Sequence, residues 1–114
     1  MRDLIKIFKA LSDSNRIRIL KMLQIRPLCV CEITAVLNLA TSTVSKHLSI
    51  LREVDLIYDI KEGKWVNYYF NKKSNDLYIK DILPLLKEWL PQDSLVKEDM
   101  LKVSKVDRTI LCKS

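Results

Sequence analysis

Residues 33–48 read ITAVLNLATSTVSKHL, and this stretch decides the fold. Its first half carries apolar residues three and four positions apart: Ile33, Val36 and Leu37. This spacing predicts a helix that follows Pro27 and ends near Asn38. A short turn over residues 39–41 separates this helix from a second one.

The second helix of this pair has one apolar stripe and one polar face. The stripe has residues at positions i, i+4 and i+7: Val44, Leu48 and Leu51. The polar face carries short hydroxyls and cations: Ser42, Thr43, Ser45, Lys46, Ser49 and Arg52. Thr41 or Ser42 is expected to cap the helix. Any amphipathic surface helix has a polar outward face, so this pattern alone leaves an ordinary surface helix open.

Two more helices are predicted before this pair. Helical spacing of apolar residues indicates the first over residues 3–11, and N-cap residue types over 12–15 break the pattern. The second then runs to a point before Pro27. Three basic residues of this second helix are expected to point to solvent: Arg16, Arg18 and Lys21.

After the helix pair the hydrophobic period changes. Residues 56–60 and 65–70 have β-rich compositions, and residues 61–64 between them predict a hairpin. Gly63, the only glycine, is expected to adopt a positive φ in its turn. A further helix is predicted from Asp76, with Pro84 expected to kink or restart it.

The order helix, turn, helix, hairpin is that of a winged helix-turn-helix, a mainly α fold with a small β-hairpin. The 114 residues are enough for one compact core. We assign residues 1–92 to a DNA-binding and dimerisation domain. Residues 93–114 are expected to form a tail with a short helix and a mobile end.

The charge of the chain favours a polyanionic partner, since the formal net charge is +6. A recognition helix must present short polar and basic side chains to double-stranded DNA, and the hairpin tip can reach phosphates. His47 has a second interpretation, as a hydrogen-bonding residue at the edge of the core. The candidate DNA-binding residues are Thr41, Ser42, Thr43, Ser45, Lys46, His47, Lys61 and Lys64.

Features that are missing from the sequence limit the cellular compartment and the kind of reaction that can be expected of this protein. It has no apolar run long enough to cross a membrane and no signal-peptide pattern, so a cytoplasmic protein is expected. It offers no Ser/His/Asp set and no Gly-rich phosphate loop, so an enzyme is not expected. Its three cysteines, Cys29, Cys31 and Cys112, cannot all pair within one chain, and thiols are expected in a reducing compartment.

Cys29 and Cys31 are predicted to begin the helix that follows Pro27. Thiolates are soft ligands, and a helix N-terminus lowers the pKa of a cysteine. Residues at i and i+2 of a helix point about 200° apart, so joint ligation of one ion would distort the helix start. The alternative is that both cysteines are small buried hydrophobes.

Five segments, in this order, resemble the ArsR/SmtB family of metal-sensing repressors: FKALSD at 8–13, RIRIL at 16–20, LCVCEI at 28–33, STVSKHL at 42–48 and EGKWVNY at 62–68. The resemblance implies a homodimer formed through the first and last helices. It also implies a repressor that binds operator DNA without metal and releases it when metal binds.

The residues themselves also favour a dimer, because one small core cannot easily bury two further groups of apolar side chains. These groups are Leu4, Ile5 and Phe8 near the N-terminus, and Ile82, Leu86, Trp89 and Leu90 in the helix after Asp76. Pairing across a two-fold axis would bury both groups and align two recognition helices with a palindromic site. The alternative is that these residues close the core of the monomer.

The resemblance is nearer to the arsenic branch of the family, which implies trivalent arsenic or antimony as the inducer. The cadmium/lead branch adds cysteines from an N-terminal arm, which this sequence does not show. Some arsenic sensors have a third cysteine where Thr34 stands here, so Cys112 is the candidate third ligand. Several alternatives stay open. Cys112 could instead be a spare thiol or the resolving cysteine of a redox sensor. The inducer could be a methylated arsenical, or the protein could be a cadmium or lead sensor.

Overall fold

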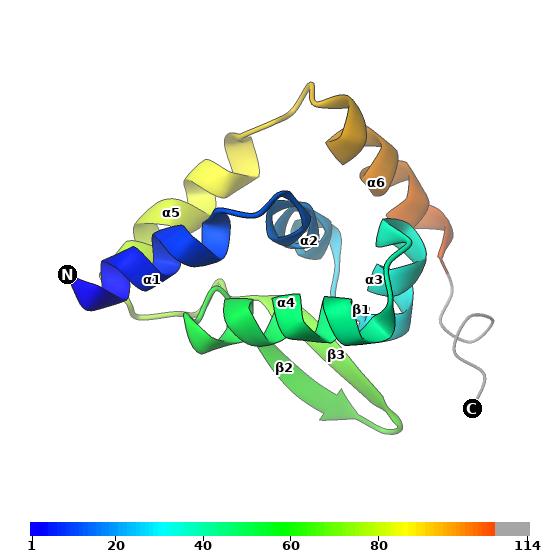
Figure 1. Ribbon diagram of the computed structural model, residues 1–114, viewed down its shortest axis with the longest axis horizontal. Helices are drawn as coiled ribbons and strands as arrows, with labels where there is room; N and C mark the ends of the chain where they lie inside the picture. The colour runs from blue at the N-terminus through cyan, green and yellow to red at the C-terminus, as the bar shows by residue number, and fades with distance from the viewer. Residues whose placement is uncertain (107–114) are drawn as a thin grey trace.

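The computed structural model describes residues 1–106 and confirms a mainly helical winged helix-turn-helix. The elements in chain order are α1 (Arg2–Leu11), α2 (Ser14–Ile25), β1 (Leu28–Cys29), α3 (Val30–Leu37), α4 (Thr41–Glu53), β2 (Ile57–Glu62), β3 (Trp65–Phe70), α5 (Leu77–Glu88) and α6 (Ser94–Lys105). Helix α2 lies at the centre of the helices and contacts α1, α4, α5 and α6, while the hairpin of β2 and β3 projects away from them (Figure 1). Within residues 1–106, no helix is long and apolar enough to cross a membrane.

The apolar stripe predicted for α4 is confirmed as part of the hydrophobic core. Val44, Leu48 and Leu51 are all completely buried. The expected cap is wrong, because Ala40 is the N-cap and no side chain caps the helix. Helix α3 ends at Asn38, which has a left-handed conformation with φ of 56°, and α4 begins at Thr41.

The hairpin forms as predicted, and Gly63 has a φ of 64° in its turn. The sequence did not predict β1, whose Leu28 and Cys29 pair antiparallel with Tyr68 and Asn67 of β3. A two-residue strand shows no alternation that a sequence pattern could reveal. As a result, Cys29 lies in the sheet and at the N-cap of α3 rather than inside the helix.

The basic residues of α2 do not point freely to solvent as expected. Lys21 is only 5% exposed, and its ammonium donates hydrogen bonds to the backbone oxygens of Leu86, Lys87 and Trp89 at 3.0, 3.1 and 2.7 Å. These carbonyls belong to the C-terminal end of α5, where helices leave acceptors unsatisfied. Burial lowers the pKa of Lys21 below its usual value. Lys21 therefore anchors α5 to the central helix.

Helix α6 packs on α2 and α3 and buries Val96, Asp99 and Val103. The carboxylate of Asp99 accepts two hydrogen bonds from Arg18, at 2.8 and 2.9 Å. Apolar contact and a buried ion pair thus hold α6 against the domain. Cys112 and the expected mobile end lie outside the described residues.

Asp13 caps α2 by accepting hydrogen bonds from the backbone N–H groups of Asn15 and Arg16. Burial raises the pKa of Asp13, but these N–H groups and the nearby charge of His47 outweigh it, so the pKa lies below the usual 3.8. A carboxylate with a depressed pKa stabilises the fold above its unfolded-state pKa, and this contribution is lost as the pH falls through the folded-state pKa.

We therefore expect Asp13→Ala to lower the free energy of unfolding by about 1 kcal/mol at neutral pH, measured by urea denaturation. The difference from the parent protein should shrink as the pH falls below 3.8. Asp13→Asn is the matched control, because it keeps a capping oxygen and removes the charge. A difference between parent and Asp13→Ala that is independent of pH would contradict this account.

Candidate nucleic-acid interface and thiol site

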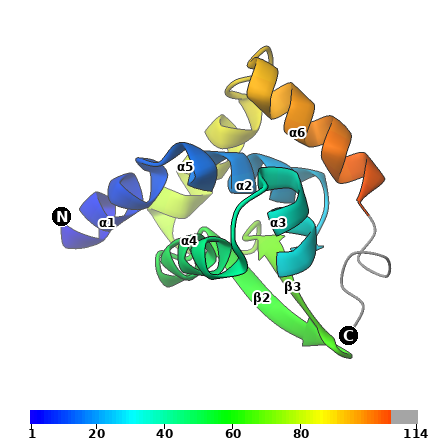
Figure 2. The same ribbon diagram turned by 45° about the vertical axis from the view of Figure 1, so that its right-hand side comes forward.

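Helix α4 lies beside the hairpin (Figure 2), and most side chains of its polar face are exposed. Four of the candidate DNA-binding residues on this helix are exposed and Ser45 is half-buried; the exposed ones are Thr41, Ser42, Thr43 and Lys46. The buried stripe on the opposite face anchors the helix to the core. This arrangement leaves short hydroxyls and one cation free to meet a groove.

His47 is half-buried and turns toward α2. Its Nδ1 lies 3.2 Å from Nη1 of Arg16, a residue that the sequence analysis did not include in the interface. Arg16 also donates to the carbonyl oxygens of Ala10 and Lys9, at 2.6 and 3.2 Å. A cleft of about 530 Å³ opens here, lined by Arg16, Ser42, Thr43, Lys46, His47 and Ile50. The cleft has cationic walls and no carboxylate, so it suits a phosphate.

The wing carries the two predicted lysines, Lys61 and Lys64, and both are exposed. The ammonium of Lys64 lies 5.1 Å from the ring centre of Trp65. At the base of the wing, Arg52 of α4 donates to Asp59 of β2 at 2.8 Å. The wing is therefore tied to the same helix that presents the polar face.

Cys29 is a free thiol that is 3% exposed. Its backbone N–H donates to Oε1 of Glu32 at 3.0 Å, which satisfies the start of α3. Burial raises the pKa of the Cys29 thiol, and the Glu32 carboxylate adds to this effect. The expectation that the helix N-terminus lowers this pKa is wrong, because desolvation of the buried sulfur dominates.

Cys31 lies in the first turn of α3 and is half-buried. It is disulfide-bonded in this structure, so the expectation of three thiols does not hold for it. Thr34, where some arsenic sensors have a third cysteine, donates its hydroxyl to the carbonyl oxygen of Cys31 at 2.8 Å. No group of three His, Cys, Asp or Glu residues able to hold a metal occurs within residues 1–106.

A raised pKa predicts a slow thiol. In reduced protein, we expect iodoacetamide to modify Cys29 about tenfold more slowly at neutral pH than it modifies free cysteine, because little thiolate is present. The rate should still be rising at pH 9.0, the ordinary thiol value. Peptide mapping by mass spectrometry assigns the rate to Cys29. A rate that levels off below pH 9.0 would show that the thiol is activated instead.

Glu32 connects the thiol site to α6. It is 3% exposed, and its Oε2 accepts a hydrogen bond from Nη1 of Arg26 at 3.1 Å. Nη2 of Arg26 donates to the carbonyl oxygens of Val103 and Val106, at 3.0 and 3.3 Å. The backbone of Cys29 is thus linked through two charged side chains to the C-terminal end of α6. No periodic pattern in the sequence marked either charged residue.

The thiol site is also one helix away from the polar face of α4. Helix α3, which Cys29 caps, packs directly against α4, and Figure 1 shows it at an angle to α4 beside one end of that helix. Apolar residues from both helices meet in this contact, among them Ile33, Val36 and Leu48. The start of α3 is therefore connected through packed apolar side chains to the helix that carries the polar face.

These features define a winged helix-turn-helix transcription regulator. The chain belongs to the ArsR family of bacterial regulatory proteins, whose family model matches residues 13–59. It is 35% identical over 98 residues to the arsenic resistance transcriptional regulator ArsR1 of Pseudomonas putida, covering 82% of this chain and 77% of that protein.

The names of other relatives refer to different metals or metalloids, arsenic in one case and cadmium in another. The arsenical resistance operon repressor of Escherichia coli K12 is 42% identical over 56% of each chain, so the match spans about half of that protein. A Staphylococcus aureus homologue of the cadmium resistance regulator CadC is 40% identical over 58% of this chain and 55% of that protein. Reduced HlyU from Vibrio cholerae has a similar structure, with a TM-score of 0.66 and 30% identity over 80% of this chain and 92% of that one.

Proposed function

We propose that this protein is a homodimeric repressor that releases operator DNA when trivalent arsenic or antimony binds its cysteines. The observation that carries the proposal is the position of Cys29 and Cys31 at the start of α3, the helix packed against α4. The names of the Pseudomonas putida and Escherichia coli relatives support arsenic as the inducer. Thiolates select soft ions, which agrees with this choice.

Binding of the inducer would begin at a buried, protonated thiol. Each reduced cysteine would displace one hydroxyl of arsenous acid as water and form one sulfur–arsenic bond. Because residues at i and i+2 diverge on a helix, engaging both Cys29 and Cys31 requires the first turn of α3 to change shape. Cys112 is the proposed third ligand.

A change in this turn would break the network of Cys29, Glu32 and Arg26 and disturb the contact between α3 and α4. In the reduced form without inducer, we expect both to be intact and the polar face of α4 to be presented. The inducer therefore favours a second conformation by its differential affinity for it. Loss of DNA affinity follows if the second conformation no longer aligns α4 with the wing.

For the DNA complex we propose contacts from the exposed hydroxyls and lysines of α4 and from Lys61 and Lys64 of the wing. Arg16 and His47 would lie beside a backbone phosphate in the cleft between α2 and α4. The cationic lining of that cleft supports the assignment.

Support for the homodimer comes from apolar side chains that the monomer leaves exposed. Phe8 of α1 is 53% exposed, and Trp89 and Leu90 after α5 are 46% and 43% exposed. Helices α1 and α5, which contain or precede these residues, lie side by side in Figure 1 and Figure 2. By contrast, Leu86 is buried in the monomer core, in line with the alternative interpretation of that residue.

The test is fluorescence anisotropy of a labelled operator taken from the region upstream of this gene. Reduced protein should bind the operator, and arsenite should release it. Cys29→Ser should bind equally well and no longer respond, whereas the matched control Thr34→Ser should respond like the parent. Release by cadmium but not by arsenite would overturn the inducer, and no binding to any DNA at moderate salt would overturn the repressor.

A thiol-redox repressor is a second candidate function, supported by the disulfide bond of Cys31. In that case oxidation of two thiols to a disulfide, with two electrons and two protons passing to an oxidant such as a peroxide, would replace metalloid binding. The same operator assay separates the two. Release by peroxide that dithiothreitol reverses, with no response to arsenite, would establish the redox function.

A further inference from the structure

Two neighbouring cavities meet at the end of the hairpin, and the larger of them is also lined by α5. The larger, here called the lysine pocket, has a volume of about 440 Å³ and is lined by Phe70, Asn71, Lys72, Ser74, Lys80, Leu83, Pro84 and Lys87. The smaller, here called the glutamine pocket, has about 230 Å³ and includes Gln24, Arg26, Tyr58, Tyr69 and Lys73. Phe70 and Lys72 line both, so the two cavities share a wall.

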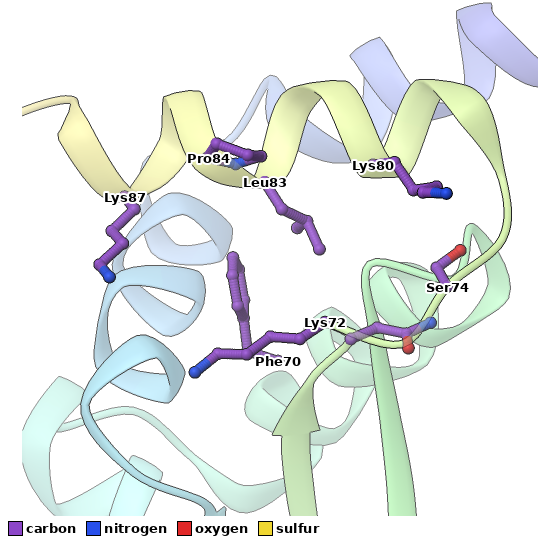
Figure 3. A pocket seen from close by; sticks show the side chains of 8 residues that line it. Phe70, Lys72, Ser74, Lys80, Leu83, Pro84 and Lys87 are labelled. Atoms are coloured by element: carbon purple, nitrogen blue, oxygen red, sulfur yellow. The ribbon is translucent and has the colours of Figure 1, made fainter.

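The lysine pocket has an apolar floor and a cationic rim. Figure 3 shows the Phe70 ring and the Leu83 side chain pointing toward each other, with the amines of Lys72 and Lys87 on one side and Lys80 with Ser74 on the other. Phe70 and Leu83 are 8% and 6% exposed. None of the three lysines makes an ion pair within residues 1–106. Three ammonium groups around an apolar floor favour an anion with an apolar body.

The glutamine pocket adds an unsatisfied donor. Nε2 of Gln24 is buried and has no hydrogen-bond partner in the part of the chain that the structure describes. Such a group normally meets water or a ligand, because leaving it unpaired is unfavourable. The rings of Tyr58 and Tyr69, which also line this pocket, are stacked with their centroids 5.0 Å apart. This pocket therefore offers an aromatic surface, cations and an amide donor.

Every charged side chain that lines the two cavities is cationic: Arg26, Lys72, Lys73, Lys80 and Lys87. Helix α5 contributes Lys80, Leu83, Pro84 and Lys87, which follow one another at helical spacing along one stripe. The exposed apolar residues Tyr78 and Leu85 lie on another stripe of the same helix, and Trp89 follows its end. The lysine pocket is therefore on a different face of α5 from the one proposed for the dimer. No cysteine lines either cavity, although Arg26 of the glutamine pocket also binds Glu32.

We propose that these cavities form a second effector site, which binds a small aromatic carboxylate. The aromatic body lies against Phe70 and Leu83, and the carboxylate accepts hydrogen bonds from Lys72 and from the second lysine on that side, Lys87. The buried amide of Gln24, which lines the glutamine pocket together with Lys72, provides a donor for a further oxygen of a larger ligand. The site joins α2, the hairpin and α5, and α2 contacts both of the other elements.

The probe is 2-naphthoate, titrated into reduced ¹⁵N-labelled protein and followed by two-dimensional NMR. Saturable shifts should centre on Phe70, Lys72, Leu83 and Lys87. The uncharged analogue 2-naphthamide has the same aromatic body and should bind about tenfold more weakly. Lys72→Gln should weaken naphthoate by a similar factor, whereas Lys105→Gln, the same change on α6, should leave the affinity unaltered.

Three results would overturn the proposal: no saturable shift at millimolar naphthoate, equal binding of the acid and the amide, or shifts centred on Phe8 and Trp89 instead of the pocket. Because Lys72 is exposed and its side chain forms no ion pair with a described residue, the variant should fold like the parent. The titration does not involve operator DNA or arsenite, so its outcome is separate from that of the proposed repressor function.

Discussion

Replacing Arg18 with methionine is expected to lower the free energy of unfolding by about 3–5 kcal/mol. Asp99 is 1% exposed, and its two oxygens are bound by the guanidinium of Arg18. The pair also raises the pKa of Arg18, as expected for a charge held by its partner. Removing the cation leaves a buried carboxylate without its main partner. Urea denaturation followed by circular dichroism measures the loss, and helix α6 should separate first.

Two further variants separate this effect from a general loss of charge. Lys102→Met removes one member of an exposed pair with Glu98 on the same helix and should change stability by less than about 0.5 kcal/mol. The double variant Arg18→Met/Asp99→Leu replaces both charges with apolar groups and should recover most of the loss. If the double variant is as unstable as Arg18→Met alone, the buried carboxylate is not the cause.

Lys46→Gln is expected to lower operator affinity about 10- to 100-fold without lowering the melting temperature. Lys46 is exposed on the polar face of α4 and lines the cationic cleft beside Arg16. Each lysine that neutralises a phosphate releases counterions, and a homodimer loses two such contacts. The slope of log K against log salt should therefore become shallower by about 2. Anisotropy titrations at several salt concentrations give both quantities.

Lys105→Gln is the matched control, because it removes the same charge from α6, away from α4 and the wing. It should leave the salt slope unchanged and alter the affinity only slightly. An unchanged slope in Lys46→Gln, even with weaker binding, would mean that this lysine acts through the structure of α4 and contacts no phosphate.

Local patterns predicted the elements that carry the proposed function. The stripe of Val44, Leu48 and Leu51 placed α4 correctly. In an amphipathic helix, the side chains that repeat at helical spacing are the ones that the core buries. Gly63 marked the hairpin turn, since its positive φ is the conformation that other residues avoid. The order of the predicted helices and hairpin indicated the winged helix-turn-helix, whereas the polar face by itself left an ordinary surface helix open.

Pairings between distant residues could not be predicted in this way. Arg18 and Asp99 are 81 positions apart, and Lys21 lies 65 to 68 positions before the carbonyls that it binds. A basic residue on an amphipathic helix is usually solvated, so the expectation that both point to solvent was reasonable and wrong. Only the packing of α5 and α6 against α2 supplies the acceptors.

The sequence by itself determined the chemistry available to this protein: a cationic polar helix, a wing and two cysteines close together. The tertiary structure decided how that chemistry is held. It placed Cys29 in a two-residue strand, buried its sulfur and thereby raised its pKa, where a helix start alone would lower it. The physical reason is that the solvation and long-range contacts of a residue depend on the elements that pack over it. The local periodicity of the sequence contains no information about those elements.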